Sequence, residues 1–279
     1  MKSEYYGEYY EHENSHWWFR WRFDMITQIV DALPKSGTFR LLDAGCGTGQ
    51  MTKLLEGYGD AVGLEIAPEA IAYARRRGVK NIVQGSIADP PFAAGSFDLV
   101  LSLDVIEHVD NDVHILSSLF DILKPGGHLI VTVPAFEALW SEHDEINQHK
   151  RRYRVPQLRQ MLIDAGFDVS RVTYCNSALF VPVLATRKVR TWWRRFRGHS
   201  IEDHPISDLA FYPKRVNEAL YRILTTETRL MQHWDMPVGV SILAVAQRPL
   251  EVGADNEPAN ISIDSLIAEP EQQKVLTAQ

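Results

Sequence analysis

The chain has 279 residues, of which 45% are hydrophobic, and a formal net charge of −7. This length and apolar content allow a substantial buried core, which excludes a disordered or fibrous protein. The acidic balance argues against a protein that coats nucleic acid, because phosphate binding requires clustered Lys and Arg. Two cysteines, Cys46 and Cys175, are too few for a disulfide framework, so a reducing, cytoplasmic compartment is expected.

Residues 1–37 are predicted to form an N-terminal helical lid. Its helix runs from the aromatic stretch at Trp17 to about Leu33 and is ended by Pro34. Trp17 and Trp18 are interpreted as packing residues. The first residues lack the apolar segment of a secretory signal, and no run reaches the roughly 18 apolar residues of a membrane span.

Residues 38–175 alternate between apolar strand patterns and helix patterns. This alternation predicts an α/β fold with a parallel, doubly wound sheet that binds ligands at the carboxyl ends of its strands. The predicted strands are mostly continuous apolar runs, as expected for a sheet covered on both faces. They span residues 39–43, 61–65, 81–84, 97–103, 128–133 and 168–174.

The first of these strands ends in the segment from Asp43 to Gly49, with glycines at every second position. Glycine lets the backbone turn sharply and approach a ligand closely, and the next residues, 50–56, read as a helix. A dinucleotide site needs G-x-G-x-x-G. The G-x-G-x-G spacing and the preceding aspartate favour a nucleoside cofactor that carries an amino acid.

This segment resembles motif I of class I S-adenosylmethionine (SAM)-dependent methyltransferases. Three later segments, residues 62–65, 96–102 and 123–131, resemble further motifs in the family's order, so the resemblance covers about residues 38–175. The chain is broadly similar to the type 11/12 and ubiquinone-pathway groups. The resemblance implies a Rossmann-like, mostly parallel seven-stranded sheet with an antiparallel last strand.

The resemblance also implies which residues hold SAM. Asp43 would orient the amino group of its methionine part, Glu65 would bind the ribose, and Arg20 or Arg22 would meet the carboxylate. Ser86 stands where many relatives carry an aspartate for the adenine. The full set of implied SAM-binding residues is Asp43, Gly45, Cys46, Gly47, Gly49, Glu65, Ile66, Ser86, Ile87, Asp104 and Arg20.

The segment from Asp104 to His108 follows the fourth predicted strand. Its Asp-x-x-Glu-His spacing is similar to the Glu-x-x-Glu-His metal ligands of a few relatives, and such donors can hold a divalent ion. In the alternative interpretation, Asp104 lines the pocket while Glu107 and His108 orient the next helix. We expect a site without metal.

Residues 134–153 are expected to face the acceptor of the methyl group. Two histidines and an acid in this loop suit a general base with substrate clamps. The candidate catalytic residues are His143, His149 and Asp144, with His143 the first choice as base. The alternative is that Asp144 pairs with Arg152 and only holds the loop.

Residues 176–238 are interpreted as an insertion before the final strand, which lies in 239–250; residues 251–279 read as a disordered acidic tail. Six basic residues surround Trp192 and Trp193 at 187–197, and no acidic residue occurs between 176 and 200. This patch could contact an anionic membrane, or it could be a solvated helix packed on the core. Nucleic acid is a weaker third interpretation. A second helix is predicted at about 213–232.

Together these features predict a SAM-dependent methyltransferase acting on oxygen, carbon or nitrogen of a small acceptor, which could be lipid-linked or a saccharide. The protein is expected in the cytoplasm, with peripheral contact to the inner face of a membrane as an option. One alternative is a catalytically silent SAM-binding regulatory or scaffold subunit. An NAD-dependent enzyme is the other, although its glycine spacing is missing.

Overall fold

The computed structural model describes residues 5–35, 37–197 and 212–250, with side chains described up to Val189 and again from Tyr212. In this part of the chain, seven strands form one sheet in the order β3-β2-β1-β4-β5-β7-β6. Strand β7 pairs antiparallel with β5 and β6, and the other pairings are parallel. The expected Rossmann-like architecture with an antiparallel last strand is confirmed.

The strands other than the edge strand β3 are buried over most of their length, as their apolar runs predict. Their bounds are β1 Arg40–Ala44, β2 Asp60–Glu65, β3 Ile82–Gln84, β4 Phe97–Leu103, β5 Leu123–Pro134, β6 Asp168–Cys175 and β7 Ser241–Gln247. Strand β5 begins five residues before the predicted start at His128. Residues 123–127 look like a turn in sequence, but Leu123 pairs with Phe97 and thereby extends the ladder.

Most helices connect these strands or pack beside the sheet. Their bounds are α1 Tyr5–His12, α2 Trp17–Ala32, α3 Gln50–Leu55, α4 Pro68–Arg76, η1 Ile106–His108, α5 Asp112–Ile122, η2 Glu137–Leu139, α6 Glu142–Asn147, α7 Val155–Asp164, α8 Phe180–Arg197 and α9 Lys214–Met231. None of the described helices is long and apolar enough to cross a lipid bilayer.

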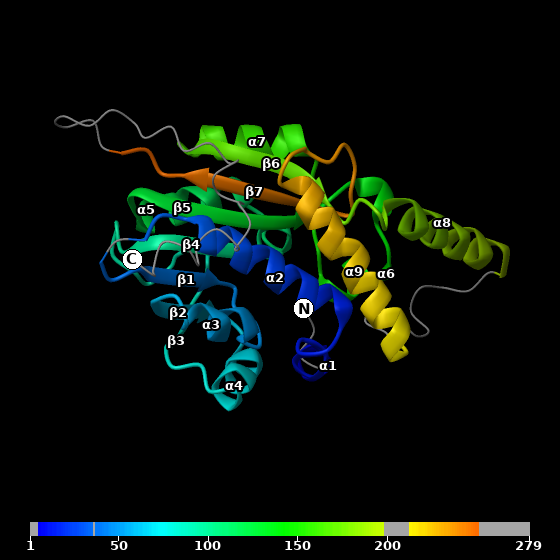
Figure 1. The fold of residues 1–279 in the computed structure, drawn as a ribbon, viewed down its shortest axis with the longest axis horizontal. Helices are drawn as coiled ribbons and strands as arrows, with labels where there is room; N and C mark the ends of the chain where they lie inside the picture. The colour runs from blue at the N-terminus through cyan, green and yellow to red at the C-terminus, as the bar shows by residue number, and fades with distance from the viewer. Residues whose placement is uncertain (1–4, 36, 198–211, 251–279) are drawn as a thin grey trace, which may run out of the picture.

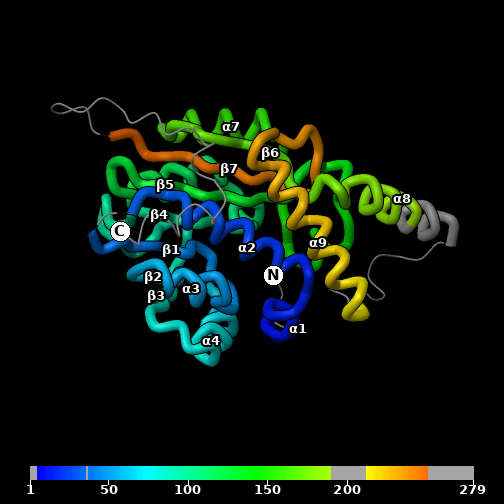
Figure 2. The backbone as a smooth tube through the Cα atoms, in the orientation of Figure 1, coloured from blue at the N-terminus to red at the C-terminus, as the bar shows by residue number. Residues whose placement is uncertain are grey.

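The two faces of the sheet carry separate apolar cores. One core packs α5 and α7 on the sheet, and the other packs α2, α3 and α9 on it. Figure 1 shows α2 and α9 running side by side over the sheet, while α8 points away from it. Figure 2 shows the same arrangement of the backbone.

The N-terminal segment and the insertion form one layer. Trp21 Nε1 of α2 donates a hydrogen bond of 2.8 Å to Thr228 Oγ1 of α9, and the backbone N–H of Trp17 donates to Asn217 Oδ1 at 2.8 Å. Two segments about 200 residues apart in sequence therefore cover the sheet together. The predicted disordered tail and the middle of the insertion, residues 198–211, lie outside the described residues.

Candidate functional site

A cavity of about 520 Å³ lies at the carboxyl ends of β1, β4 and β5. Its floor includes the glycine loop after β1, Leu103 at the end of β4 with the following Asp104, and Pro134 at the end of β5. Its other walls come from α1, α2, α6 and the start of α8. The volume is within the range of small-molecule sites, and the position is the ligand crevice of an open α/β sheet.

The glycine loop is fixed to the neighbouring strand and open toward the cavity. The backbone N–H groups of Gly45 and Cys46 donate to the carbonyl of Leu64 at 2.8 and 3.0 Å. At Gly47, whose φ is +54°, an added Cβ would meet no protein atom within 4 Å. The backbone there can approach a ligand closely, as the motif predicts.

Gly49 has a different role from the one predicted for it. A Cβ at this position would lie 2.6 Å from Ala74 Cβ of α4, and its φ is +83°. The residue therefore allows α4 to pack under the loop, and it does not line the cavity.

Two carboxylates lie at the strand ends beside the loop. Asp43 is buried, accepts a hydrogen bond of 2.6 Å from Thr52 Oγ1, and lines the cavity. Burial raises the pKa of Asp43 to about 6, although Thr52 and Arg22 oppose the shift. Glu65 accepts from the backbone N–H groups of Gly47, Ile66 and Ala67, each at 2.9 Å. Backbone donors thus orient the Glu65 carboxylate next to the loop.

Among the other implied cofactor residues, Gly45, Cys46 and Asp104 line the cavity, whereas Ile66, Ser86 and Ile87 do not. Ile66 is 65% exposed, while Ile87 belongs to the core under α5. Ser86 Oγ accepts a hydrogen bond from the backbone N–H of Ala88 at 3.1 Å. Their roles toward an adenine stay predictions.

For Arg20, the prediction of a cavity-facing cation is corrected. Arg20 Nη1 lies 3.2 Å from Glu218 Oε2, and its guanidinium lies over the Tyr221 ring, so it faces α9. Arg22 instead lines the cavity. Its Nη2 donates to the carbonyl of Leu103 at 2.7 Å, and its Nη1 lies 3.3 Å from Asp104 Oδ2. The two arginines lie two residues apart on α2, so they point to different sides of the helix.

The N-terminal segment closes over the loop through one buried carboxyl. Glu13 accepts a hydrogen bond from Thr48 Oγ1 and lies 2.5 Å from Arg77 Nη2. Burial raises the pKa of Glu13 to about 7, against the effect of both partners. Tyr6 and Tyr9 line the cavity beside Glu13, so the segment before α2 forms part of the site.

Asp144 is the centre of a buried network on the opposite wall. Arg152 contacts both of its oxygens, with Nε 2.8 Å from Oδ1 and Nη2 3.0 Å from Oδ2. His149 Nδ1 lies 2.9 Å from Asp144 Oδ1. Burial raises the pKa of Asp144, but His149 and Arg152 outweigh it and hold the pKa well below its usual range.

This network shows that Asp144 pairs with Arg152, the alternative left open by the sequence. The carboxylate also caps α6, since its Oδ2 accepts from the backbone N–H of Ser141 at 2.8 Å. Asp144 is fully buried and does not line the cavity, whereas Arg152 and His149 do. Asp144 therefore orients His149 and has no direct access to a ligand.

His143 has a different environment. Its Nε2 lies 3.1 Å from Asn147 Nδ2, and Asn147 Oδ1 accepts a hydrogen bond from Tyr9 at 3.2 Å. Since an amide nitrogen only donates, His143 Nε2 acts as the acceptor in this contact. The Nε2 lone pair of His143, which would take up the proton if this residue were the base, is therefore already engaged by Asn147.

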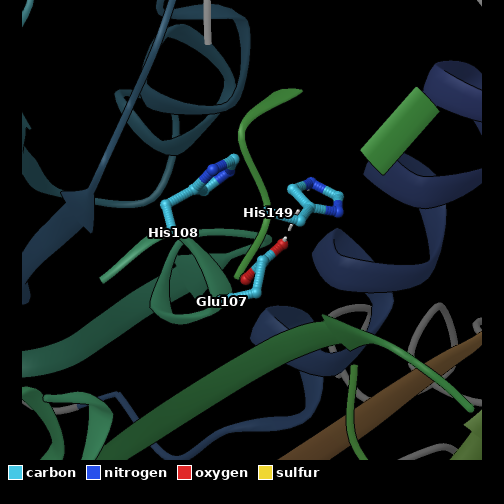
Figure 3. Close-up of side chains that lie close together, drawn as sticks. All are labelled: Glu107, His108 and His149. Carbon is cyan, nitrogen blue, oxygen red and sulfur yellow. Dashed lines mark ion pairs between the residues drawn. The ribbon is translucent and has the colours of Figure 1, made fainter. Parts of the chain in front are cut away.

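Glu107, His108 and His149 form a compact cluster at the same wall (Figure 3). Their ligand atoms lie within 4.8 Å of one another, and Glu107 Oε1 is 3.9 Å from His149 Nε2. Neither carboxyl oxygen of Glu107 has a hydrogen-bond partner among the described residues. Burial raises the pKa of Glu107 well above its usual range. Two imidazoles and a carboxyl form a donor set that fits a divalent cation.

Three cavity residues had no signal in the sequence. Glu13 and Asn147 belong to no motif, and Asn176 follows β6 at a φ of +61°. Asn176 is buried and lines the cavity, and its Oδ1 has no hydrogen-bond partner in the described part of the chain. The φ above zero at a non-glycine residue is visible only in the structure.

Comparison with known proteins identifies the family. Residues 42–131 match the family model described as a methyltransferase domain. A protein of Mycolicibacterium smegmatis named "probable S-adenosylmethionine-dependent methyltransferase" is 30% identical over 157 residues, which cover 55% of this chain and 60% of that protein. The chain belongs to the class I SAM-dependent methyltransferase family.

Other methyltransferase relatives differ in their acceptors. The ubiquinone biosynthesis O-methyltransferase of Cereibacter sphaeroides is 36% identical over 124 residues, 39% of this chain and 50% of that protein. The malonyl-[acyl-carrier protein] O-methyltransferase of Enterobacter lignolyticus is 30% identical over 162 residues, 55% of this chain and 62% of that protein. The chain thus spans about half to three fifths of the length of these methyltransferases.

Solved structures of the methyltransferase fold extend the match to most of the chain. A Haloferax volcanii complex of the Trm112 methyltransferase activator with a methyltransferase gives a TM-score of 0.57 at 18% identity, covering 88% of this chain and 97% of that chain. The [4+2]-cyclase SpnF gives 0.53 at 20% identity, covering 82% and 81%. At such identities the likeness shows the fold alone, and the cyclase illustrates that the fold does not determine the reaction.

Proposed function

We propose that the protein transfers the methyl group of SAM to a small acceptor bound in the 520 Å³ cavity. One observation carries the proposal: the same cavity is lined by Asp43 and Gly47 of motif I and by His149, which Asp144 orients. Donor and acceptor could therefore meet within one cavity. A catalytically silent binding protein would have no need of the oriented histidine.

The residues present fit SAM. Asp43 offers a buried carboxylate for the ammonium group of its methionine part, and Arg22 offers a guanidinium for the carboxylate. The open backbone at Gly47 leaves room for the ligand, and Glu65 is held at the adjacent strand end. Bound SAM supplies an electrophilic methyl group on a good leaving group, so positioning is the main task of the protein.

We assign the general base to His149, ahead of His143. A base needs a free nitrogen and a partner that fixes its tautomer. Asp144 accepts the Nδ1 proton of His149 in a hydrogen bond, which leaves the Nε2 lone pair to take a proton from an acceptor hydroxyl or amine. In His143, by contrast, the Nε2 lone pair already accepts a hydrogen bond from the Asn147 amide.

The reaction is expected to need no metal ion, although Glu107, His108 and His149 could hold one. A cation there would polarise an acceptor oxygen as a Lewis acid. We expect methyl transfer to continue after exhaustive chelation, because Asp144 and His149 already provide a base. Metal content and activity after chelation are the measurements. Activity that disappears and returns with one divalent ion would assign the cluster as a metal site.

The affinity for S-adenosylhomocysteine should depend on the ionisation of Asp43. Its ionised form binds the ligand ammonium, so protonation at low pH weakens binding. With a pKa of about 6, affinity should level off above pH 7 and be about tenfold lower at pH 5. Calorimetric titration across this range measures the effect.

The matched variant for this prediction is Asp43→Asn, which should weaken binding and flatten the pH profile between 5 and 6.5. Glu13 lines the same cavity and its pKa is about 7, so Glu13→Gln is the control and should keep the low-pH limb. If the affinity of Asp43→Asn for S-adenosylhomocysteine still fell toward pH 5, the proposed role of Asp43 would be contradicted.

Two measurements test the proposed function together. The first is binding of S-adenosylhomocysteine, with NAD as the comparison ligand. The second is transfer of a labelled methyl group from SAM to small-molecule and lipid fractions of the host cell. Binding with a labelled product supports the proposal. Binding without product in any fraction supports a scaffold role, and preference for NAD would refute both.

A further inference from the structure

Helix α8 contacts the cavity with some of its residues and leaves others exposed. Pro182, Val183, Thr186 and Arg187 line the cavity. Val181 and Val189 do not line the cavity and are 68% and 55% exposed. Val181 lies on the opposite side of the helix from Val183, whereas Val189 lies one turn beyond Thr186 along the helix. The helix points away from the sheet in Figure 1, so its exposed face is not covered by the described elements.

Apolar residues at helical spacing extend the exposed side of α8 along the sequence. Ala185 is exposed between Val181 and Val189, and these three residues are spaced by four. On the period of the helix, Trp192 and Phe196 follow three and seven residues after Val189, which are positions of the same face. The side chains after Val189 lie outside the described residues, so this extension rests on the sequence and the helical backbone.

The charge of this segment is opposite to that of the whole chain. The helix carries six basic residues and no acidic one, while the chain has a net charge of −7. A helix with an apolar stripe, flanking cations and aromatic residues is the type that lies in the plane of an anionic lipid surface. Nucleic acid fits less well, because its backbone attracts the cations but offers nothing for exposed valines.

We propose that α8 docks on an anionic lipid surface and that the cavity receives an amphipathic acceptor from it. The second part rests on the proposed function: the acceptor would place its polar group near His149 and its apolar chain past Leu179 and Val183, which line the cavity at the start of α8. The acceptor class is therefore a small polar head carrying a hydrocarbon chain.

Vesicle sedimentation tests the docking surface with the full chain. The probes are vesicles of phosphatidylcholine alone and vesicles with about 30 mol% phosphatidylglycerol. We expect binding to the anionic vesicles only. Because apolar contacts are not screened by salt, part of this binding should persist at about 0.5 M NaCl.

The decisive variant is Val189→Glu, which places a charge on the exposed stripe. Vesicle affinity should fall by about tenfold or more, because the variant loses an exposed valine that would insert into the lipid and places a carboxylate beside the flanking cations. Ile223→Glu is the matched control: Ile223 is 46% exposed on α9, another amphipathic helix, and its change should leave vesicle binding within about twofold. Both variants should bind S-adenosylhomocysteine normally, which shows that they are folded.

Several results would overturn the proposal. These are equal binding of Val189→Glu and wild type, no preference for anionic vesicles, or binding to a single-stranded oligonucleotide without vesicle binding. A dimer that Val189→Glu dissociates, again without vesicle binding, would assign the face to a second copy of the chain. Failure here leaves cofactor binding and methyl transfer untouched, so the two proposals fail separately.

Discussion

Replacing His149 by alanine is expected to lower kcat by about 10²–10⁴-fold, the range that a positioned acid–base group contributes. His149 lines the cavity, and its Nδ1 is fixed by Asp144 at 2.9 Å. Without the imidazole of His149, no side chain takes the proton that the methylated group must lose. The residues expected to bind SAM are unchanged. The measurement is single-turnover transfer of a labelled methyl group to the acceptor fraction that the labelling experiment identifies.

The control is His143→Ala, which should keep kcat within about fivefold, because its Nε2 already accepts from Asn147. Both variants should bind S-adenosylhomocysteine with nearly unchanged affinity. If His149→Ala retained most of its turnover and His143→Ala lost it, the base would be His143. That outcome would restore the order that the sequence favoured.

Replacing Arg152 by leucine should destabilise the fold by about 3–5 kcal/mol, because it leaves the buried Asp144 carboxylate without its main counter-charge. Both residues are buried, and the pair is bidentate. For a chain of this size the melting temperature should fall by about 6–20 °C. Thermal unfolding monitored by circular dichroism measures the change.

An exposed ion pair provides the comparison. Arg222 Nε lies 3.3 Å from Glu218 Oε1, and the Arg222 side chain is 77% exposed. Arg222→Leu should therefore cost less than about 1 kcal/mol. The loss of stability for Arg152→Lys should lie between those of the other two variants, since lysine keeps the charge but cannot form the bidentate contact. A loss below about 1 kcal/mol for Arg152→Leu would contradict the view that Asp144 depends on this partner.

Secondary structure was predictable where the signal is local. The strands and the end of α2 were predicted to within a few residues from the G-x-G-x-G loop, the apolar runs and Pro34. The first part of β5 was missed because residues 123–127 contain a Pro-Gly-Gly turn signal. Their extended conformation depends on pairing with β4, a contact that is distant in sequence.

For the acceptor side of the site, the sequence predicted which segment is involved but not how its side chains pair with one another. Residue types in 134–153 indicated a base and clamps, yet two histidines and several acids allow many pairings. Only the fold shows that Arg152 engages both oxygens of Asp144, and that Asp144 in turn fixes His149. The sequence analysis ranked His143 ahead of His149, but the order of residues in the chain says nothing about which imidazole lone pair is free.

The sequence by itself determined the family and located the glycine loop that lines the cavity, because such a loop is built from neighbouring residues whose backbone conformation depends on glycine. It also indicated the basic, aromatic segment of α8. The tertiary structure alone decided that Glu13 closes over the loop, that Arg22 and not Arg20 faces the cavity, and that α8 forms one wall of it. These contacts join residues far apart in the chain, and burial and packing select them after the strands have assembled.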